Sequence, residues 1–120
     1  INDFMPFVPH NTIQEIVLRL IQIGKHIKSS IRDVHMCIQS LYPVNEKFDR
    51  GFLNGVNNNQ IRTLNGSLKE QCKDNHFTFI DVYPHLLDKN RQLDQCLTLD
   101  GIHVNVSAYK TILGLLRPYF

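Results

Sequence analysis

The sequence lacks the features that would place it in a membrane or on a nucleic acid. No apolar stretch approaches the roughly 18 residues that a membrane-spanning helix needs. The 13 lysines and arginines are scattered and leave a net charge of only +2, with no basic run and no basic stripe interleaved with aromatic residues. We therefore expect no membrane span and no nucleic-acid partner. The 120 residues, 42% of them apolar, support one domain with a modest core.

Cysteine and histidine are too few or too dispersed for a disulfide framework or a metal centre. The three cysteines, Cys37, Cys72 and Cys96, are odd in number and lack metal-ligand spacing. The six histidines form no His-x-His or His-Glu-x-x-His pattern. These absences argue against a metal site built from Asp100, His103 and a further histidine, and we expect neither a metal nor another cofactor.

Hydrophobic periodicity predicts alternating helices and strands. Helices follow from apolar residues at three- and four-residue spacing, and strands from short β-branched and aromatic runs. The predicted elements are helix 12–29, strand 33–41, helix 58–74, strand 76–83 and helix 106–116. A helix between two strands is typical of a parallel α/β unit, whose active site lies at the carboxyl ends of the strands. That position would bring Ser40, Tyr42 and Asn45 near any site.

The same patterns assign individual side chains to the interior or to solvent. Residues 45–59 are predicted to form a loop in which Arg50 is solvated. Ser40 is expected to be a hydrogen bonder at the strand end, because no Gly-x-Ser-x-Gly elbow surrounds it. The last helix is expected to start at an Asn105 cap and to turn four side chains inward: Tyr109, Ile112, Leu113 and Leu116.

An acid and a histidine lie three residues apart, on a predicted turn before the last helix. Asp100 could fix the tautomer of the His103 imidazole, which could then act as a general base. Gly101 between them permits a tight or left-handed backbone. Taken alone, such a pair also occurs as a helix cap or as two solvated side chains.

The pair stands among other motifs that together resemble the SGNH hydrolases, also called the GDSL lipase/acylhydrolase family. Residues 100–105 read Asp-Gly-Ile-His-Val-Asn and are followed by Tyr109, similar to the last motif of that family. Residues 1–3, Ile-Asn-Asp, look like the tail of its Gly-x-Asn-Asp motif. Residues 40–45 resemble its Leu-x-Pro-x-Asn strand end, and residues 79–83 its last core strand. The resemblance covers the whole chain in the family's order.

This resemblance implies a fold and a set of roles. The fold would be a three-layer α/β/α sandwich with a parallel, flavodoxin-like sheet, with residues 1–120 forming the C-terminal part of one domain and the N-terminal strands missing. His103 would be the base and Asp100 its orienting acid. Asn2 would donate to the oxyanion, although an Asn-Asp pair taken without the downstream motifs is more typical of a simple turn. Asp3, Tyr42 and Asn45 would line the pocket. The Gly-Asp-Ser motif that carries the family's nucleophile does not occur in these residues.

Two functions follow as alternatives. The first is a serine ester hydrolase acting on short-chain acyl esters, with a nucleophile supplied by a missing upstream segment. The motif forms look most like the branch with platelet-activating-factor acetylhydrolase-like proteins and carbohydrate O-acetylesterases, which implies a small ester, including an acylated carbohydrate, as substrate. The second is a truncated, non-catalytic domain that serves as a binding or structural module. The isolated chain is expected to be inactive in either case.

Overall fold

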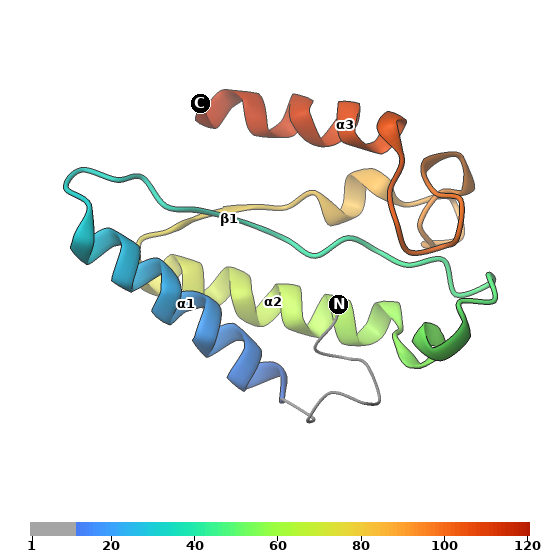
Figure 1. Ribbon diagram of the computed structural model, residues 1–120, viewed down its shortest axis with the longest axis horizontal. Helices are drawn as coiled ribbons and strands as arrows, with labels where there is room; N and C mark the ends of the chain where they lie inside the picture. The colour runs from blue at the N-terminus through green and yellow to red at the C-terminus, as the bar shows by residue number, and fades with distance from the viewer. Residues whose placement is uncertain (1–11) are drawn as a thin grey trace.

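Three layers make up the structure, a computed structural model that describes residues 12–120 apart from the side chain of Phe52. Helices α1 (Ile13–Ser30) and α2 (Asn58–Asp74) form one layer, and α3 (Val106–Leu116) forms the opposite one. Between them lies a two-stranded parallel sheet of β1 (Cys37–Gln39) and β2 (Thr78–Ile80) (Figure 1). The expected α/β/α sandwich with a parallel sheet is confirmed.

Both long helices begin at a side chain that the sequence places at the right spacing. Thr12 and Glu15 form a capping box at the start of α1, and Asn57 and Gln60 form another at the start of α2. Each box satisfies two backbone N–H groups that a helix start leaves free. Gly24 lets α1 approach the sheet, because a Cβ there would lie 2.7 Å from the Phe77 ring.

The strands are shorter than expected. The patterns predict strands over 33–41 and 76–83, whereas the paired segments are three residues each, with Ile38 opposite Phe79. One further backbone bond extends the ladder beyond each end of β1, from Thr78 N–H to Met36 C=O and from Ser40 N–H to Ile80 C=O. Beyond β1, the side-chain amides of two asparagines of α2 take the backbone hydrogen bonds of Leu41 and Val44.

Two expectations about side chains are wrong. Arg50 is buried, 9% exposed, because a 3₁₀ helix at Gly51–Gly55 folds over it. Its Nη1 donates to the Val56 carbonyl at 2.6 Å and so holds this connection together. Tyr109 and Leu113 point outward, 51% and 61% exposed, because a sheet of two strands covers only one flank of α3.

The final helix otherwise begins and ends as predicted. Asn105 caps it, its side-chain oxygen accepting from the N–H groups of Ser107 and Ala108. Ala108 and Ile112 are buried against the residues that follow β2. The helix therefore fixes the loop that precedes it against the sheet.

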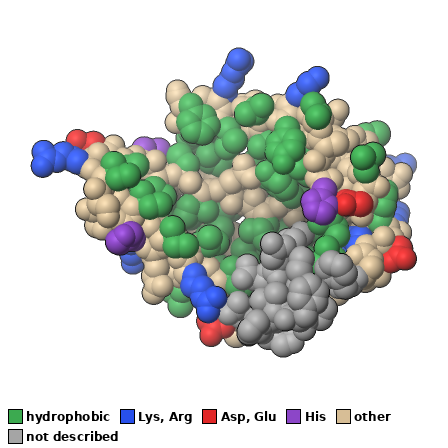
Figure 2. All heavy atoms as spheres, in the orientation of Figure 1, with side chains coloured by type: hydrophobic (Ala, Val, Ile, Leu, Met, Phe, Trp, Pro, Cys, Tyr) green, Lys and Arg blue, Asp and Glu red, His purple; other side chains and the backbone are tan. Residues whose placement is uncertain are grey.

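Within the described residues, β1 is paired on one side only. Figure 2 shows hydrophobic side chains gathered on the face of the molecule where β1 lies nearest to the viewer. In a strand, the backbone N–H and C=O groups of successive residues point alternately toward the strand on one side and the strand on the other. Since Met36 and Ser40 bond to β2, Cys37 and Gln39 direct theirs toward the open edge.

We expect this edge to make the 120-residue chain self-associate, since an unpaired strand beside apolar surface is a template for another chain. Gln39→Pro removes an outward N–H without touching the ladder to β2 and should weaken the association. Gln39→Ala, which keeps the N–H, is the matched control and should associate like the wild type. Sedimentation velocity at several concentrations measures the effect. A monodisperse wild-type monomer with a cooperative melt would contradict this expectation.

Candidate active site

The loop between Leu97 and α3 holds the acid and the histidine in one rigid turn. Its two sides meet at an antiparallel bridge between Thr98 and Val104. The Thr98 hydroxyl donates to the His103 carbonyl at 2.7 Å and accepts from the Gly101 N–H at 3.0 Å. Thr98 is buried, so these bonds cross the inside of the turn and fix its shape.

The Asp100 carboxylate is bound on both of its oxygens. Oδ1 accepts from the backbone N–H groups of Ile102 and His103 at 2.9 and 2.8 Å. Oδ2 lies 2.6 Å from Nδ1 of the His103 ring. Partial burial alone would raise the pKa of Asp100, but the hydrogen bonds from the His103 ring and from the two backbone N–H groups outweigh it and hold the pKa at about 2.

The protonation state of Asp100 determines which nitrogen of the His103 ring is free to accept a proton. An ionised carboxylate only accepts, so Nδ1 of His103 carries the proton and donates it to Asp100. In the neutral ring Nε2 then holds the lone pair. The His103 side chain is 81% exposed, so Nε2 is accessible to a proton donor from solvent or from another segment.

Gly101 connects this turn to the segment that follows β1. It has a φ of +80°, which side chains rarely adopt, and it is buried. Its carbonyl accepts from the Asn45 N–H at 2.8 Å, and an added Cβ would lie 2.8 Å from Cβ of Phe48. The contact leaves no room for any other residue at this position.

A cavity of about 300 Å³ lies beside the turn. Its lining residues are Gln39, Ser40, Leu41, Tyr42 and Ile102. Ile102 stands between Asp100 and His103 in the sequence, so the cavity adjoins the pair at the carboxyl end of β1. Tyr42 lines this cavity, and its hydroxyl accepts from Nε2 of Gln39 at 2.9 Å. Sequence reasoning missed Gln39 and Ile102, although Ile102 lies inside the motif and Gln39 ends the strand.

Two other predicted residues have a structural task. Ser40 is buried and its hydroxyl accepts from the N–H groups of Val82 and Tyr83, which confirms the strand-end role. Asn45 was expected to line the pocket, but its side chain is fully buried and donates to the Leu93 carbonyl at 2.8 Å, so a ligand cannot reach it. It links two loops instead.

Some expectations concern groups that the structure does not describe. Asn2 and Asp3 lie outside the described residues. Among residues 12–120, no cluster of three or more His, Cys, Asp or Glu side chains could hold a metal ion, and no helix there is long and apolar enough to cross a membrane.

Comparisons with known proteins place this geometry in a known fold. No protein-family model matches the sequence, and no curated protein does. Among solved structures, the chain is similar to a protein from Streptococcus pneumoniae provisionally named a platelet activating factor (TM-score 0.85, 24% identity). It is also similar to a provisionally assigned acylhydrolase from Bacteroides fragilis (0.83, 18%) and to a GDSL-like lipase from Bacteroides thetaiotaomicron (0.79, 17%).

These likenesses establish an SGNH hydrolase-like fold. They extend over 98%, 98% and 96% of this chain. The chain in turn covers 55%, 56% and 55% of those three proteins, little more than half of each. At these identities the likeness concerns the fold, and the chemistry has to be argued from the residues.

Gly101→Ala should destabilise the protein by about 1–3 kcal/mol, the usual cost of forcing a side chain into strained backbone, with a further cost from the clash with Phe48. Urea unfolding measures the change. Gly66→Ala is the matched control: nothing lies within 4 Å of a Cβ there, and the position is inside α2. That variant should be more stable by about 0.5–1 kcal/mol. Equal stability of Gly101→Ala and wild type would contradict this prediction, because it would mean that the turn can move away from Phe48.

The pKa of Asp100 should be about 2 when followed by carbon-detected NMR. His103→Ala removes one of its hydrogen bonds and should raise the pKa toward, but not to, 3.8, because the backbone donors remain. A carboxyl whose pKa is lowered in the folded state stabilises that state at pH values above its pKa in the unfolded chain. Its contribution is therefore lost as the pH falls from 3.8 toward 2. His26→Ala, an exposed histidine of α1, should leave this pKa unchanged.

Proposed function

We propose that this chain carries the histidine–aspartate part of a serine ester hydrolase's active site, and that the nucleophilic serine belongs to an upstream segment. The observation that supports this most is the 2.6 Å contact between Nδ1 of His103 and Oδ2 of Asp100 on an exposed turn beside a cavity. The SGNH hydrolase-like fold adds to it, since two of the similar structures are named an acylhydrolase and a GDSL-like lipase.

The chemistry assigned to the pair follows from its hydrogen bonds. Nε2 of His103 accepts the proton of the serine hydroxyl as that oxygen attacks the ester carbonyl. The ring becomes an imidazolium, and the ionised Asp100 stabilises its charge through the bond to Nδ1. The same proton then passes to the leaving alcohol. Thr98 and Gly101 act indirectly, because they hold the turn in place.

The oxyanion that forms on the carbonyl needs a donor. We assign this role to the side-chain amide of Asn2, on the resemblance of residues 1–3 to the family motif. A preorganised amide at this position stabilises the charge that develops in the transition state. Asp3 is assigned to the pocket on the same resemblance.

The substrate we propose is a short-chain acyl ester, including an acetyl group on a carbohydrate. The cavity beside Ile102 is about 300 Å³, the lower end of the range for ligand pockets. Tyr42 and Gln39 provide polar groups on its wall, and Leu41 and Ile102 provide apolar surface. Such a wall suits a small acyl group attached to a polar alcohol.

A non-catalytic binding or structural module is the second candidate. One observation favours it: among the described residues no hydroxyl is hydrogen-bonded to the His103 ring, and the nearby Ser40 is buried with its oxygen occupied by two backbone donors. A fluorophosphonate probe separates the two candidates, because it labels only a serine that is activated by a base. Labelling of an upstream serine that disappears in His103→Ala supports the hydrolase.

We expect negligible hydrolysis of p-nitrophenyl acetate by the 120-residue chain alone, because base and acid without a nucleophile leave only a modest acceleration. Adding the upstream segment, fused or as a peptide, should restore turnover. In the restored enzyme, His103→Ala should reduce kcat by several orders of magnitude. Asn2→Ala should reduce it roughly a hundred- to a thousandfold, the usual loss for one oxyanion donor.

The exposed His26 of α1 provides the control for these variants. His26→Ala removes a histidine far from the turn in sequence and should leave kcat and KM unchanged. Robust ester hydrolysis by the 120 residues alone would refute the proposal. So would a reconstituted enzyme that is indifferent to His103.

A further inference from the structure

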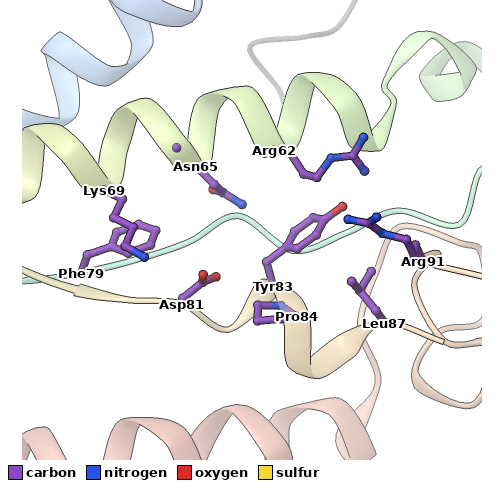
Figure 3. A pocket seen from close by; sticks show the side chains of 10 residues that line it. Arg62, Asn65, Lys69, Phe79, Asp81, Tyr83, Pro84, Leu87 and Arg91 are labelled. Carbon is purple, nitrogen blue, oxygen red and sulfur yellow. The ribbon is translucent and has the colours of Figure 1, made fainter. Parts of the chain in front are cut away.

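A second cavity, of about 330 Å³, lies between α2 and the segment that follows β2 (Figure 3). It shares no lining residue with the cavity beside Ile102. Arg62 of α2 and Arg91 of the later turn stand at one end, and Lys69 and Asp81 stand at the other. Neither the Asp100–His103 pair nor the proposed ester chemistry involves these residues.

Tyr83 forms the centre of this cavity. Figure 3 shows its hydroxyl directed toward the guanidinium groups of Arg62 and Arg91. The residue is only 7% exposed, and its hydroxyl is buried without a hydrogen-bond partner among the described residues. A buried hydroxyl that makes no hydrogen bond is costly, so an unfilled one marks a place for a missing acceptor.

The phenol remains a donor at neutral pH. Burial raises the pKa of Tyr83, and the nearby Arg62 guanidinium opposes that rise only in part. The hydroxyl therefore keeps its proton, and two permanent cations flank it. An anion placed between them would accept from Arg62, Arg91 and Tyr83 at once.

The charges around the cavity favour an anion. Three cations, Arg62, Lys69 and Arg91, line it against one acid, Asp81. Glu46 adds a negative charge near Tyr83, but one of its oxygens already accepts the Asn58 N–H at 2.7 Å. The cationic side chains that line the cavity thus outnumber the acids.

Apolar side chains also line the cavity, and they indicate what the rest of the ligand would be. Pro84 and Leu87 provide apolar surface on the same side as the arginines, and Phe79 lies at the other end, beside Lys69. A cavity of this size holds a small organic group in addition to one oxyanion. Two arginine forks match the paired oxygens of a phosphoryl group better than a single carboxylate.

We propose that this cavity binds a phosphate monoester of a small organic molecule. The phosphoryl oxygens would accept from Arg62, Arg91 and the Tyr83 hydroxyl, and the organic group would lie against Pro84 and Leu87. This site is separate from the proposed ester hydrolysis and does not depend on it.

Isothermal titration calorimetry of the full-length protein with phenyl phosphate tests the proposal, with inorganic phosphate and phenol as comparison ligands. We expect saturable binding of phenyl phosphate, weaker binding of inorganic phosphate and none of phenol. Arg62→Ala and Arg91→Ala should each weaken phenyl phosphate binding about ten- to a hundredfold, the range for one hydrogen bond to a charged group. Tyr83→Phe, which removes only the hydroxyl, should weaken it about tenfold.

Two control variants test whether binding depends on this cavity, and not on the overall positive charge or on the Asp100–His103 turn. Arg32→Ala removes an exposed arginine before β1 and should leave the affinity unchanged, as should His103→Ala. Thermal melts confirm that each variant is folded, and Arg62→Lys, which keeps the charge but loses the fork, should bind with intermediate affinity. Absence of phenyl phosphate binding, or binding that Tyr83→Phe and both arginine variants leave unchanged, would overturn the proposal. Equal affinity for phenyl and inorganic phosphate would overturn the part that assigns the apolar surface.

Discussion

The placement of the candidate catalytic histidine depends on one backbone hydrogen bond. The Asn45 N–H donates to the Gly101 carbonyl at 2.8 Å and so joins the end of the β1 segment to the turn that carries His103. The bond forms only because Gly101 adopts a positive φ and leaves room for Phe48. Asn45 in turn is held by its own side chain, which binds the Leu93 carbonyl. One buried asparagine therefore ties three loops to one another.

Two more buried asparagines explain why the sheet is so short. After β1 the chain continues extended, yet its backbone groups meet side chains of α2 instead of a strand. The carboxamide of Asn65 accepts from the N–H of Leu41 and donates to its carbonyl, and Asn58 does the same for Val44. A carboxamide has one donor side and one acceptor side, as a peptide group has, so it can replace a neighbouring strand. These bonds also position Tyr42 and the cavity beside Ile102.

This arrangement shows which parts of the structure could be predicted from the sequence. The helices are set by local patterns, a capping residue followed by apolar spacing, and their bounds agree closely with the structure. The Asp100–His103 contact could be predicted because both residues lie on one short turn. The strand ends could not, because Asn58 and Asn65 act across more than a dozen residues of chain. Arg50, Tyr109 and Leu113 were misplaced for a similar reason, since their burial depends on which distant element covers them.

The cavity at Tyr83 is the extreme case of such long-range dependence. Its charged side chains also make the β2 edge of the sheet more polar than the β1 edge. Arg62, Tyr83 and Arg91 come from three separate segments, so no local spacing connects them. Charged side chains near a strand discourage its pairing with another chain. Lys69, Asp81 and the two arginines stand along β2, whereas apolar side chains gather where β1 lies nearest the viewer of Figures 1 and 2. The turn that carries His103 is bonded to the chain that leaves β1. The distribution of charge between the edges therefore favours pairing at β1, the strand whose continuation is bonded to the turn with His103.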